Sequence, residues 1–157
     1  MTPRGAEFVD SAPSCLTKSI IINSPIENVW KVIDDTPNYS KWFPGVKWGK
    51  FENPENKGLG AKRLAQLNSS KYYEEIISYE PMKKWGFTML ESNSGACESI
   101  SELISLESVG ENQTKVTYQG GYEFKGFYKL IKGMLEKTIN GIWDKALSGL
   151  KEYAEKK

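Results

Sequence analysis

The strongest constraint on the fold is a long helical repeat of apolar residues near the C-terminal end of the sequence. Between Phe127 and Tyr153, apolar side chains recur at intervals of three and four residues, which places them along one side of an α-helix. A helix over roughly Lys129 to Tyr153 would be on the order of 37 Å long. Such a stripe needs an equally long apolar surface to cover it. Only a β-sheet formed by the preceding residues could supply that surface.

The sequence before this helix has the patterns expected of such a sheet. A β-branched run at 18–23 precedes two short helical segments, 26–33 and 38–43. An alternating pattern with short turns then predicts six further strands, at 46–52, 59–67, 71–79, 84–91, 97–109 and 114–124. Consecutive strands with short connections pair as antiparallel neighbours. The sequence therefore predicts an α+β fold in which the long helix lies across a curved antiparallel sheet.

Length and composition fit one domain. A chain of 157 residues can bury a full core, and an aromatic content of 12% supplies large apolar side chains for it. Residues 1–14 carry two prolines and a glycine and show no sustained period, so we expect a flexible leader before a domain over 15–157. Cys15 and Cys97 lie far apart without C-x-x-C spacing, which argues against a thiol redox motif. We expect two buried reduced thiols, with a disulfide as the alternative.

Several classes of function are disfavoured by what the sequence lacks. Without any histidine there is no Ser-His-Asp or Cys-His arrangement and no His-containing metal site. We therefore assign no catalytic residue, no metal and no cofactor. The net charge is +1 with basic residues spread along the chain, which argues against nucleic acid as a partner. There is no apolar run long enough for a transmembrane segment and no apolar secretory signal, so we expect a cytoplasmic protein. The oligomeric state is not indicated.

Short motifs, in order and spacing, resemble those of one superfamily. They are I-N-S-P-I-E-N-V-W at 22–30, D-x-x-x-Y-x-x-W-x-P at 35–44, G-x-G at 58–60, Y-E-P at 79–81, and the turn at 110–116. Over roughly residues 15–155 the chain is similar to the START-like (SRPBCC) superfamily, which includes polyketide cyclases and dehydrases, lipid-transfer domains, coenzyme Q-binding proteins and the birch-pollen-allergen family. The resemblance implies a helix-grip fold: a seven-stranded sheet, two short helices after the first strand, and the long helix across the concave face. It also implies a cavity between helix and sheet.

Strand alternation indicates which side chains would face such a cavity. The residues that we predict to bind a ligand are Arg63, Tyr73, Trp85, Phe87, Met89, Glu102, Ile104, Tyr118, Tyr122, Met134 and Ile142. The same alternation places Glu75 and Glu98 on the inner wall as well. Unpaired charges in an apolar interior are costly. Either the alternation is misassigned for one strand or some charges lie at a sheet end in water, or Arg63 pairs with a glutamate or with a polar group of the ligand.

Three glycines in the predicted long helix, Gly133, Gly141 and Gly149, also need a reason, because each costs about 1 kcal/mol relative to alanine. Close packing against the sheet, a bend, or space for a ligand would each supply one.

The leading functional hypothesis is binding or transport of a hydrophobic small molecule, such as a lipid, an isoprenoid or an aromatic polyketide-like compound. A second hypothesis, from the resemblance, is a cyclase or dehydrase that moves protons with Glu98, Glu102 or a tyrosine. A third is a protein-interaction module similar to chaperone activators, with no ligand. A carrier should enclose a void, whereas an interaction module should present an exposed apolar patch.

Overall fold

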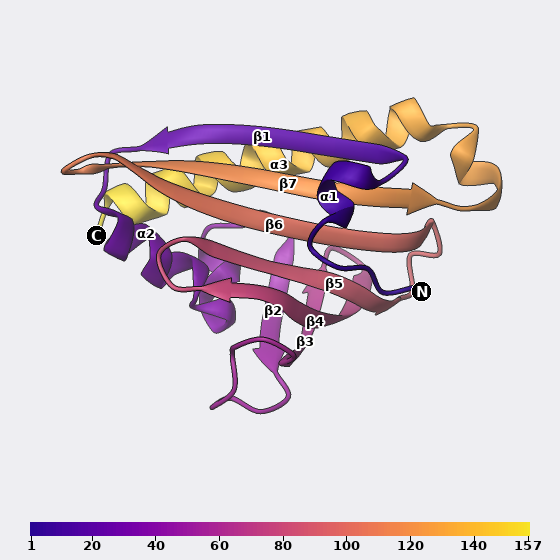
Figure 1. The fold of residues 1–157 in the computed structure, drawn as a ribbon, viewed down its shortest axis with the longest axis horizontal. Coiled ribbons are helices and arrows are strands. Elements are labelled where there is room, and N and C mark those ends of the chain that lie inside the picture. The colour runs from indigo at the N-terminus through magenta and orange to yellow at the C-terminus, as the bar shows by residue number, and fades with distance from the viewer.

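A seven-stranded antiparallel sheet forms the body of the structure, a computed structural model that describes residues 1–157 (Figure 1). Its strands are β1 (Ser14–Ile22), β2 (Val46–Phe51), β3 (Lys62–Leu67), β4 (Ser70–Glu80), β5 (Lys84–Ser92), β6 (Cys97–Gly110) and β7 (Gln113–Phe124). They lie in the order β1-β7-β6-β5-β4-β3-β2, and every neighbouring pair is antiparallel. The predicted fold is therefore confirmed.

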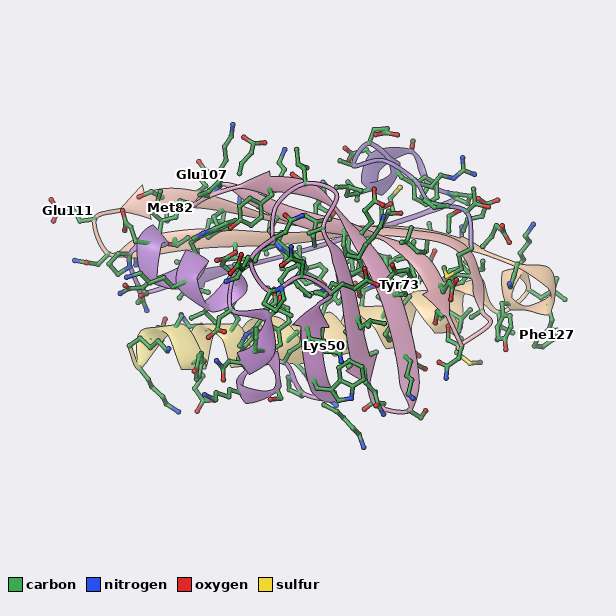
Figure 2. All side chains as sticks on the ribbon, turned by 90° about the horizontal axis from the view of Figure 1, so that it is seen from below. Lys50, Tyr73, Met82, Glu107, Glu111 and Phe127 are labelled. Atoms are coloured by element: carbon green, nitrogen blue, oxygen red, sulfur yellow. The ribbon has the colours of Figure 1, made fainter.

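Helices cover one face of this sheet. Two short ones, α2 (Ile26–Ile33) and the 3₁₀ helix η1 (Thr36–Lys41), connect β1 to β2. After β7 comes a second 3₁₀ turn, η2 (Gly126–Lys129), and then the long helix α3 (Lys132–Glu155), which runs along β1 and β7 in Figure 1. The long helix thus begins three residues later than the sequence predicts, because the chain turns at Gly126, whose φ is 54°. The turn around Glu111 and the η2 residue Phe127 mark opposite ends of the molecule (Figure 2).

The core lies between the sheet and α3. The inward side chains of β7 are buried, as the alternation predicts, and they meet Trp143, Ala146, Leu147 and Leu150 of α3. Gly149 lets this helix approach the end of η1 closely. A Cβ atom at Gly149 would lie 1.9 Å from the carbonyl oxygen of Trp42, so only glycine fits there. A Cβ at Gly133 or Gly141 would meet nothing within 4 Å, so close packing explains only one of the three glycines.

The N-terminal residues differ from the expected flexible leader. They include a short helix, α1 (Phe8–Ser11), on the face of the sheet opposite α3 (Figure 1). Phe8 and Val9 are buried, and the backbone of Gly121 comes so close to Phe8 that a Cβ would be 2.2 Å from its carbonyl oxygen. The backbone N–H of Thr2 donates to the carbonyl of Glu98 at 2.8 Å. Two adjacent apolar residues are too few to show a helical period, and this is why the sequence pattern missed the segment.

The two cysteines are free thiols, and only one is buried as predicted. Cys97 lies inside the fold. Cys15 is exposed because it alternates with the buried neighbours Ser14 and Leu16 along β1. The structure has no helix that is both apolar and long enough to span a bilayer.

Candidate ligand-binding cavity

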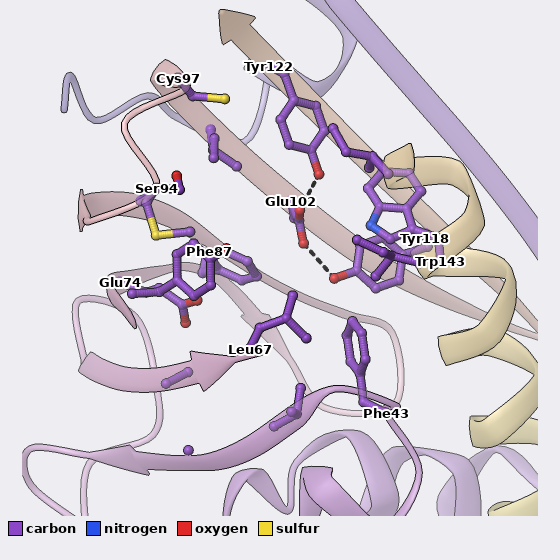
Figure 3. A pocket seen from close by; sticks show the side chains of 18 of the residues that line it. Phe43, Leu67, Glu74, Phe87, Ser94, Cys97, Glu102, Tyr118, Tyr122 and Trp143 are labelled. Atoms are coloured by element: carbon purple, nitrogen blue, oxygen red, sulfur yellow. Dashed lines mark hydrogen bonds between the residues drawn. The ribbon is translucent and has the colours of Figure 1, made fainter. Parts of the chain in front are cut away.

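A cavity of about 360 Å³ lies between α3 and strands β2 to β7 (Figure 3). Twenty-eight residues line it, of which 21 are hydrophobic. This volume falls within the range of small-molecule sites, which are mostly apolar with a few placed polar groups. The predicted site residues on its wall are Arg63, Trp85, Phe87, Met89, Glu102, Ile104, Tyr118, Tyr122 and Ile142.

Tyr73, on β4, is not on the wall. Its neighbours Tyr72 and Glu74 line the cavity instead. The two faces of this strand carry similar residues, so periodicity could not choose between them. The pairing of β4 with β3 determines which face points inward. Glu74 lies directly opposite Arg63 of β3. Glu75 lies opposite Lys62 and forms an ion pair with it on the outer face. The need of a buried guanidinium for an anionic partner was the signal that could have identified Glu74.

Met134 is also not on the wall, since 66% of its side chain is exposed. Positions 134 and 142 are separated by roughly 80° around a helix, so they need not share a face. The inner face of this half of α3 carries Leu135, Ile139 and Ile142. The apolar character of Met134 gave no warning, because exposed apolar residues are common.

Glu98 leaves the inner wall because β6 carries an irregularity between Cys97 and Ser99. A bulge reverses the alternation on one side of it. Cys97 therefore lines the cavity, while Glu98 accepts a hydrogen bond from the Thr2 hydroxyl at 2.6 Å on the other face. Of the predicted inner charges, only Arg63 and Glu102 remain inside, joined by Glu74.

Arg63 and Glu74 form a buried ion pair in the cavity wall. The Nε and Nη2 atoms of Arg63 both lie 2.6 Å from Oε2 of Glu74, and each residue is at most 4% exposed. The guanidinium also lies 4.6 Å from the ring centre of Trp85, and its Nη1 donates to Thr36 Oγ1 at 3.4 Å. Burial alone would lower the pKa of Arg63, but the adjacent Glu74 carboxylate more than offsets this and raises it. The guanidinium is thus neutralised inside the protein, which leaves it poorly suited to bind an anionic ligand.

Glu102 is the second polar centre of the cavity, on β6. It accepts hydrogen bonds from two β7 tyrosines, from Tyr118 Oη at 2.5 Å and from Tyr122 Oη (Figure 3). Burial raises the pKa of the Glu102 carboxyl to about 7, although both hydrogen bonds act in the opposite direction. Burial, together with the nearby Glu102 charge, raises the pKa of both tyrosines well above the usual value. The tyrosines therefore stay protonated as donors, and only Glu102 changes charge near neutral pH.

The geometry of this centre depends on Gly120, which lies between the two tyrosines on the inner face of β7. A Cβ at Gly120 would lie 2.6 Å from Trp143 and 2.7 Å from the Tyr122 ring. The ring centre of Trp143 is 4.5 Å from that of Tyr118. Gly120 therefore leaves room for α3 to press an indole against the tyrosine pair, which fixes the two hydroxyls over the carboxyl.

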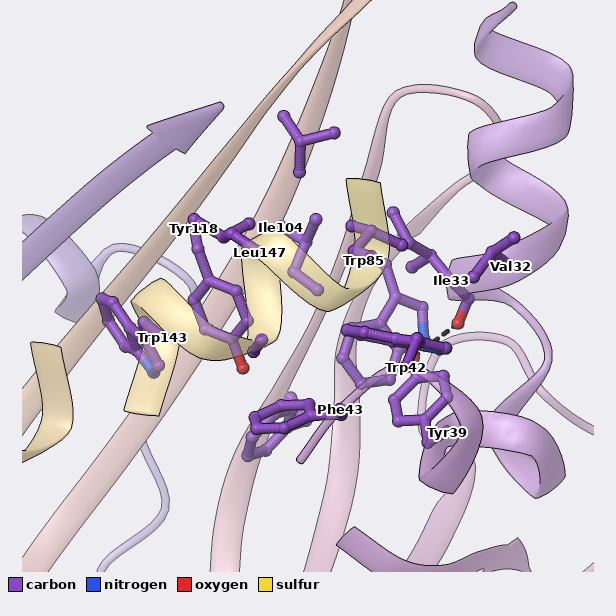
Figure 4. Close-up of a cluster of buried hydrophobic side chains, with 14 of the residues drawn as sticks. Val32, Ile33, Tyr39, Trp42, Phe43, Trp85, Ile104, Tyr118, Trp143 and Leu147 are labelled. Atoms are coloured by element: carbon purple, nitrogen blue, oxygen red, sulfur yellow. Dashed lines mark hydrogen bonds between the residues drawn. The ribbon is translucent and has the colours of Figure 1, made fainter. Parts of the chain in front are cut away.

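An aromatic cluster from η1 and the residues after it closes another side of the cavity. Tyr39, Trp42 and Phe43 all line it, and the Tyr39 hydroxyl is fixed by donating to the carbonyl of Ile33 at 2.5 Å (Figure 4). Trp42 is 4% exposed, and its Nε1 is the one buried side-chain nitrogen or oxygen atom without a hydrogen-bond partner. An unpaired buried donor costs about 1–3 kcal/mol.

A family model described as polyketide cyclase / dehydrase and lipid transport matches residues 14–155. The chain belongs to this family. Curated relatives from Mycobacterium bovis and Mycobacterium tuberculosis, which carry no assigned function, are 22% identical over 106 residues. That match covers 67% of this chain and spans 64% of the relatives' own length.

Solved structures of an aromatase/cyclase and of a START superfamily protein share the fold. The Zhui aromatase/cyclase from a Streptomyces species superposes with a TM-score of 0.79 at 13% identity, covering 90% of this chain and 93% of that one. A START superfamily protein from Mycobacterium smegmatis gives a TM-score of 0.73 at 15% identity, covering 88% and 97%. At such identities the likeness extends to the fold alone, and the activity of this family member has to be argued from its own cavity.

Proposed function

We propose that the protein binds a hydrophobic small molecule in the cavity between the sheet and α3, with a hydroxyl of the ligand placed at Glu102. The observation that carries this proposal is an apolar cavity of about 360 Å³ with one titrating carboxyl held by two tyrosines. Ligand carbon buried against the apolar wall would supply affinity, at roughly 25 cal/mol per Å² before the costs of association. A lipid, an isoprenoid or an aromatic polyketide-like compound fits this description.

The polar groups indicate how such a ligand would be oriented. Tyr118 and Tyr122 each have one hydroxyl proton, and both are donated to Glu102. A carboxylate can accept further hydrogen bonds, so Glu102 favours a donor on the ligand. Because Arg63 is already paired with Glu74, the cavity offers no free cation to a ligand carboxylate or phosphate. The ligand we propose is therefore an alcohol or phenol rather than an acid.

Native mass spectrometry tests the proposal with three probes: a long-chain alcohol, a short-chain ubiquinol and a dihydroxyanthraquinone. We expect a one-to-one complex with at least one of them. The variant Ile139→Trp puts an indole into the cavity wall and should lose the complex, while Lys145→Trp adds the same ring on an exposed position of α3 and should keep it. Circular dichroism of both variants checks that they fold. Absence of any complex with wild-type protein would contradict the proposal.

A second candidate function, proton-transfer catalysis like that of a cyclase or dehydrase, is favoured by the Glu102 pKa of about 7. A general base works best when its pKa lies near the working pH. If the protein is such an enzyme, Glu102→Gln should lose turnover while Glu98→Gln, on the opposite face of the sheet, keeps it. Equal activity of both variants on an identified substrate would exclude Glu102 as the base.

A further inference from the structure

One end of the molecule exposes a cluster of large apolar side chains. Phe127, Leu130 and Met134, here called the apolar tip, are 67%, 82% and 66% exposed and lie within eight consecutive residues of η2 and the start of α3. Phe127 projects from the end of the fold in Figure 2. The other exposed large apolar residues each belong to a different strand or loop. Scattered apolar residues are ordinary, but a cluster indicates contact with another apolar surface.

Lysines flank the apolar tip along the chain. Lys125, Lys129, Lys132 and Lys137 are all exposed, and the single acidic residue between positions 125 and 137 is Glu136. Glu136 accepts a hydrogen bond from Ser14 at 2.7 Å and pairs with Lys132, whose ammonium also donates to the carbonyl of Pro13 at 2.9 Å. The cations beside the tip without an ion pair are therefore Lys125, Lys129 and Lys137. Apolar side chains flanked by lysines complement an anionic lipid surface, in which acyl chains lie beneath negatively charged headgroups.

The apolar tip adjoins the cavity. Phe124, just before η2, and Leu135, just after Met134, both line the cavity wall. The backbone N–H of Lys125 donates to the carbonyl of Ala96 at 3.1 Å, which ties η2 to the β5–β6 turn, and that turn also lines the cavity. Two residues of the cavity wall on this side, Ser94 and Thr138, are themselves exposed, so the wall meets the protein surface here. A surface that touched the tip would lie beside this part of the wall.

We propose that the apolar tip and its lysines dock the protein on the surface of an anionic lipid bilayer, with the exposed part of the cavity wall at Ser94 and Thr138 turned toward the lipid. Phe127, Leu130 and Met134 enter the boundary between headgroups and acyl chains, and the lysines contact the headgroups. This docking surface is separate from the cavity and needs no ligand inside it.

Vesicle flotation tests the proposal. We expect the wild-type protein to float with vesicles of phosphatidylcholine and about one-third phosphatidylglycerol, and not with phosphatidylcholine alone. Binding should weaken as salt rises from about 50 to about 500 mM, because headgroup attraction is screened.

Replacing Phe127, Leu130 and Met134 by serine should lower binding by at least about tenfold. Lys129→Gln should lower it by about fivefold. Leu59→Ser removes a side chain that is equally exposed, at 68%, and should change nothing.

Three results would overturn the proposal. The first is no flotation of wild-type protein with anionic vesicles, and the second is unchanged flotation of the triple serine variant. The third is a wild-type dimer in sedimentation velocity that the triple variant abolishes, without flotation, which would assign the tip to a second copy of this chain. Glu102→Gln should float like wild type. If that variant lost ligand binding but still floated, the result would bear on the cavity and not on membrane docking.

Discussion

The buried ion pair between Arg63 and Glu74 makes two adjacent glutamates unequal in their effect on stability. Glu74→Gln leaves the guanidinium buried without its counter-charge, so we expect a loss of about 3–5 kcal/mol in the free energy of unfolding. Glu75→Gln removes only a partly exposed pair with Lys62 and should cost at most about 1 kcal/mol. Urea denaturation of both variants measures the difference. Equal losses would show that the Glu74 carboxylate does not neutralise Arg63.

Glu102 makes stability depend on pH in a defined window. Its pKa is about 7 in the folded protein, against an ordinary value of 4.5. Between these values the folded state binds more protons than the unfolded state, so stability should fall as pH rises through the window. The loss should reach about 3 kcal/mol above pH 7. Glu102→Gln removes the titrating group, and its stability should lack this fall in urea denaturation series from about pH 4 to pH 8. Parallel curves for the two proteins would contradict the raised pKa.

Single residues also show where prediction from sequence ends. Strand alternation placed Arg63 and Glu102 inside, and the structure has both on the cavity wall. It misassigned Tyr73, because both faces of β4 carry tyrosine, glutamate and isoleucine and only the pairing of Glu74 with Arg63 distinguishes them. The face of β4 that points inward is thus set by the charge of Arg63 on the neighbouring strand β3.

At the scale of elements, the glycines of α3 should respond differently to the same substitution. Gly149→Ala places a methyl group against the carbonyl of Trp42 and should destabilise the protein by about 1–3 kcal/mol or more. Gly141→Ala meets no atom and should stabilise it by up to about 1 kcal/mol, since alanine is the better helix former. Thermal unfolding of the two variants measures both signs. A stabilising Gly149→Ala would contradict the close approach of α3 to the end of η1.

The sequence could not distinguish these glycines. Their helical spacing is the same kind of signal at each position, and the contact that singles out Gly149 comes from a segment far away in the chain. The bulge in β6 was hidden for a similar reason: the alternation of residues 97–109 continues through it in the sequence, and the shift appears only in the pairing of β6 with β7. Local patterns predict the existence and type of elements, while their exact packing depends on partners.

For the whole molecule, the order of strands and helices was sufficient to predict the architecture, because short turns force antiparallel neighbours and one long apolar stripe requires a sheet to cover it. The size of the cavity was not predictable. The cavity is the volume that Trp143, Phe87 and the other lining side chains do not fill, so its size depends on the packing of every side chain around it. The same holds for the apolar tip, whose residues have the helical spacing of core residues and yet lie outside.

The most direct test of the account is to locate a bound molecule by NMR. The probe is the compound from the mass-spectrometry panel that binds best, added to protein with labelled isoleucine and leucine methyl groups. The account predicts intermolecular NOEs from the compound to Ile104 and Leu67, whose side chains line the cavity, and none to the exposed Leu59. NOEs confined to surface methyl groups such as those of Leu59 or Leu130, or no bound compound at all, would contradict the claim that this cavity is a binding site.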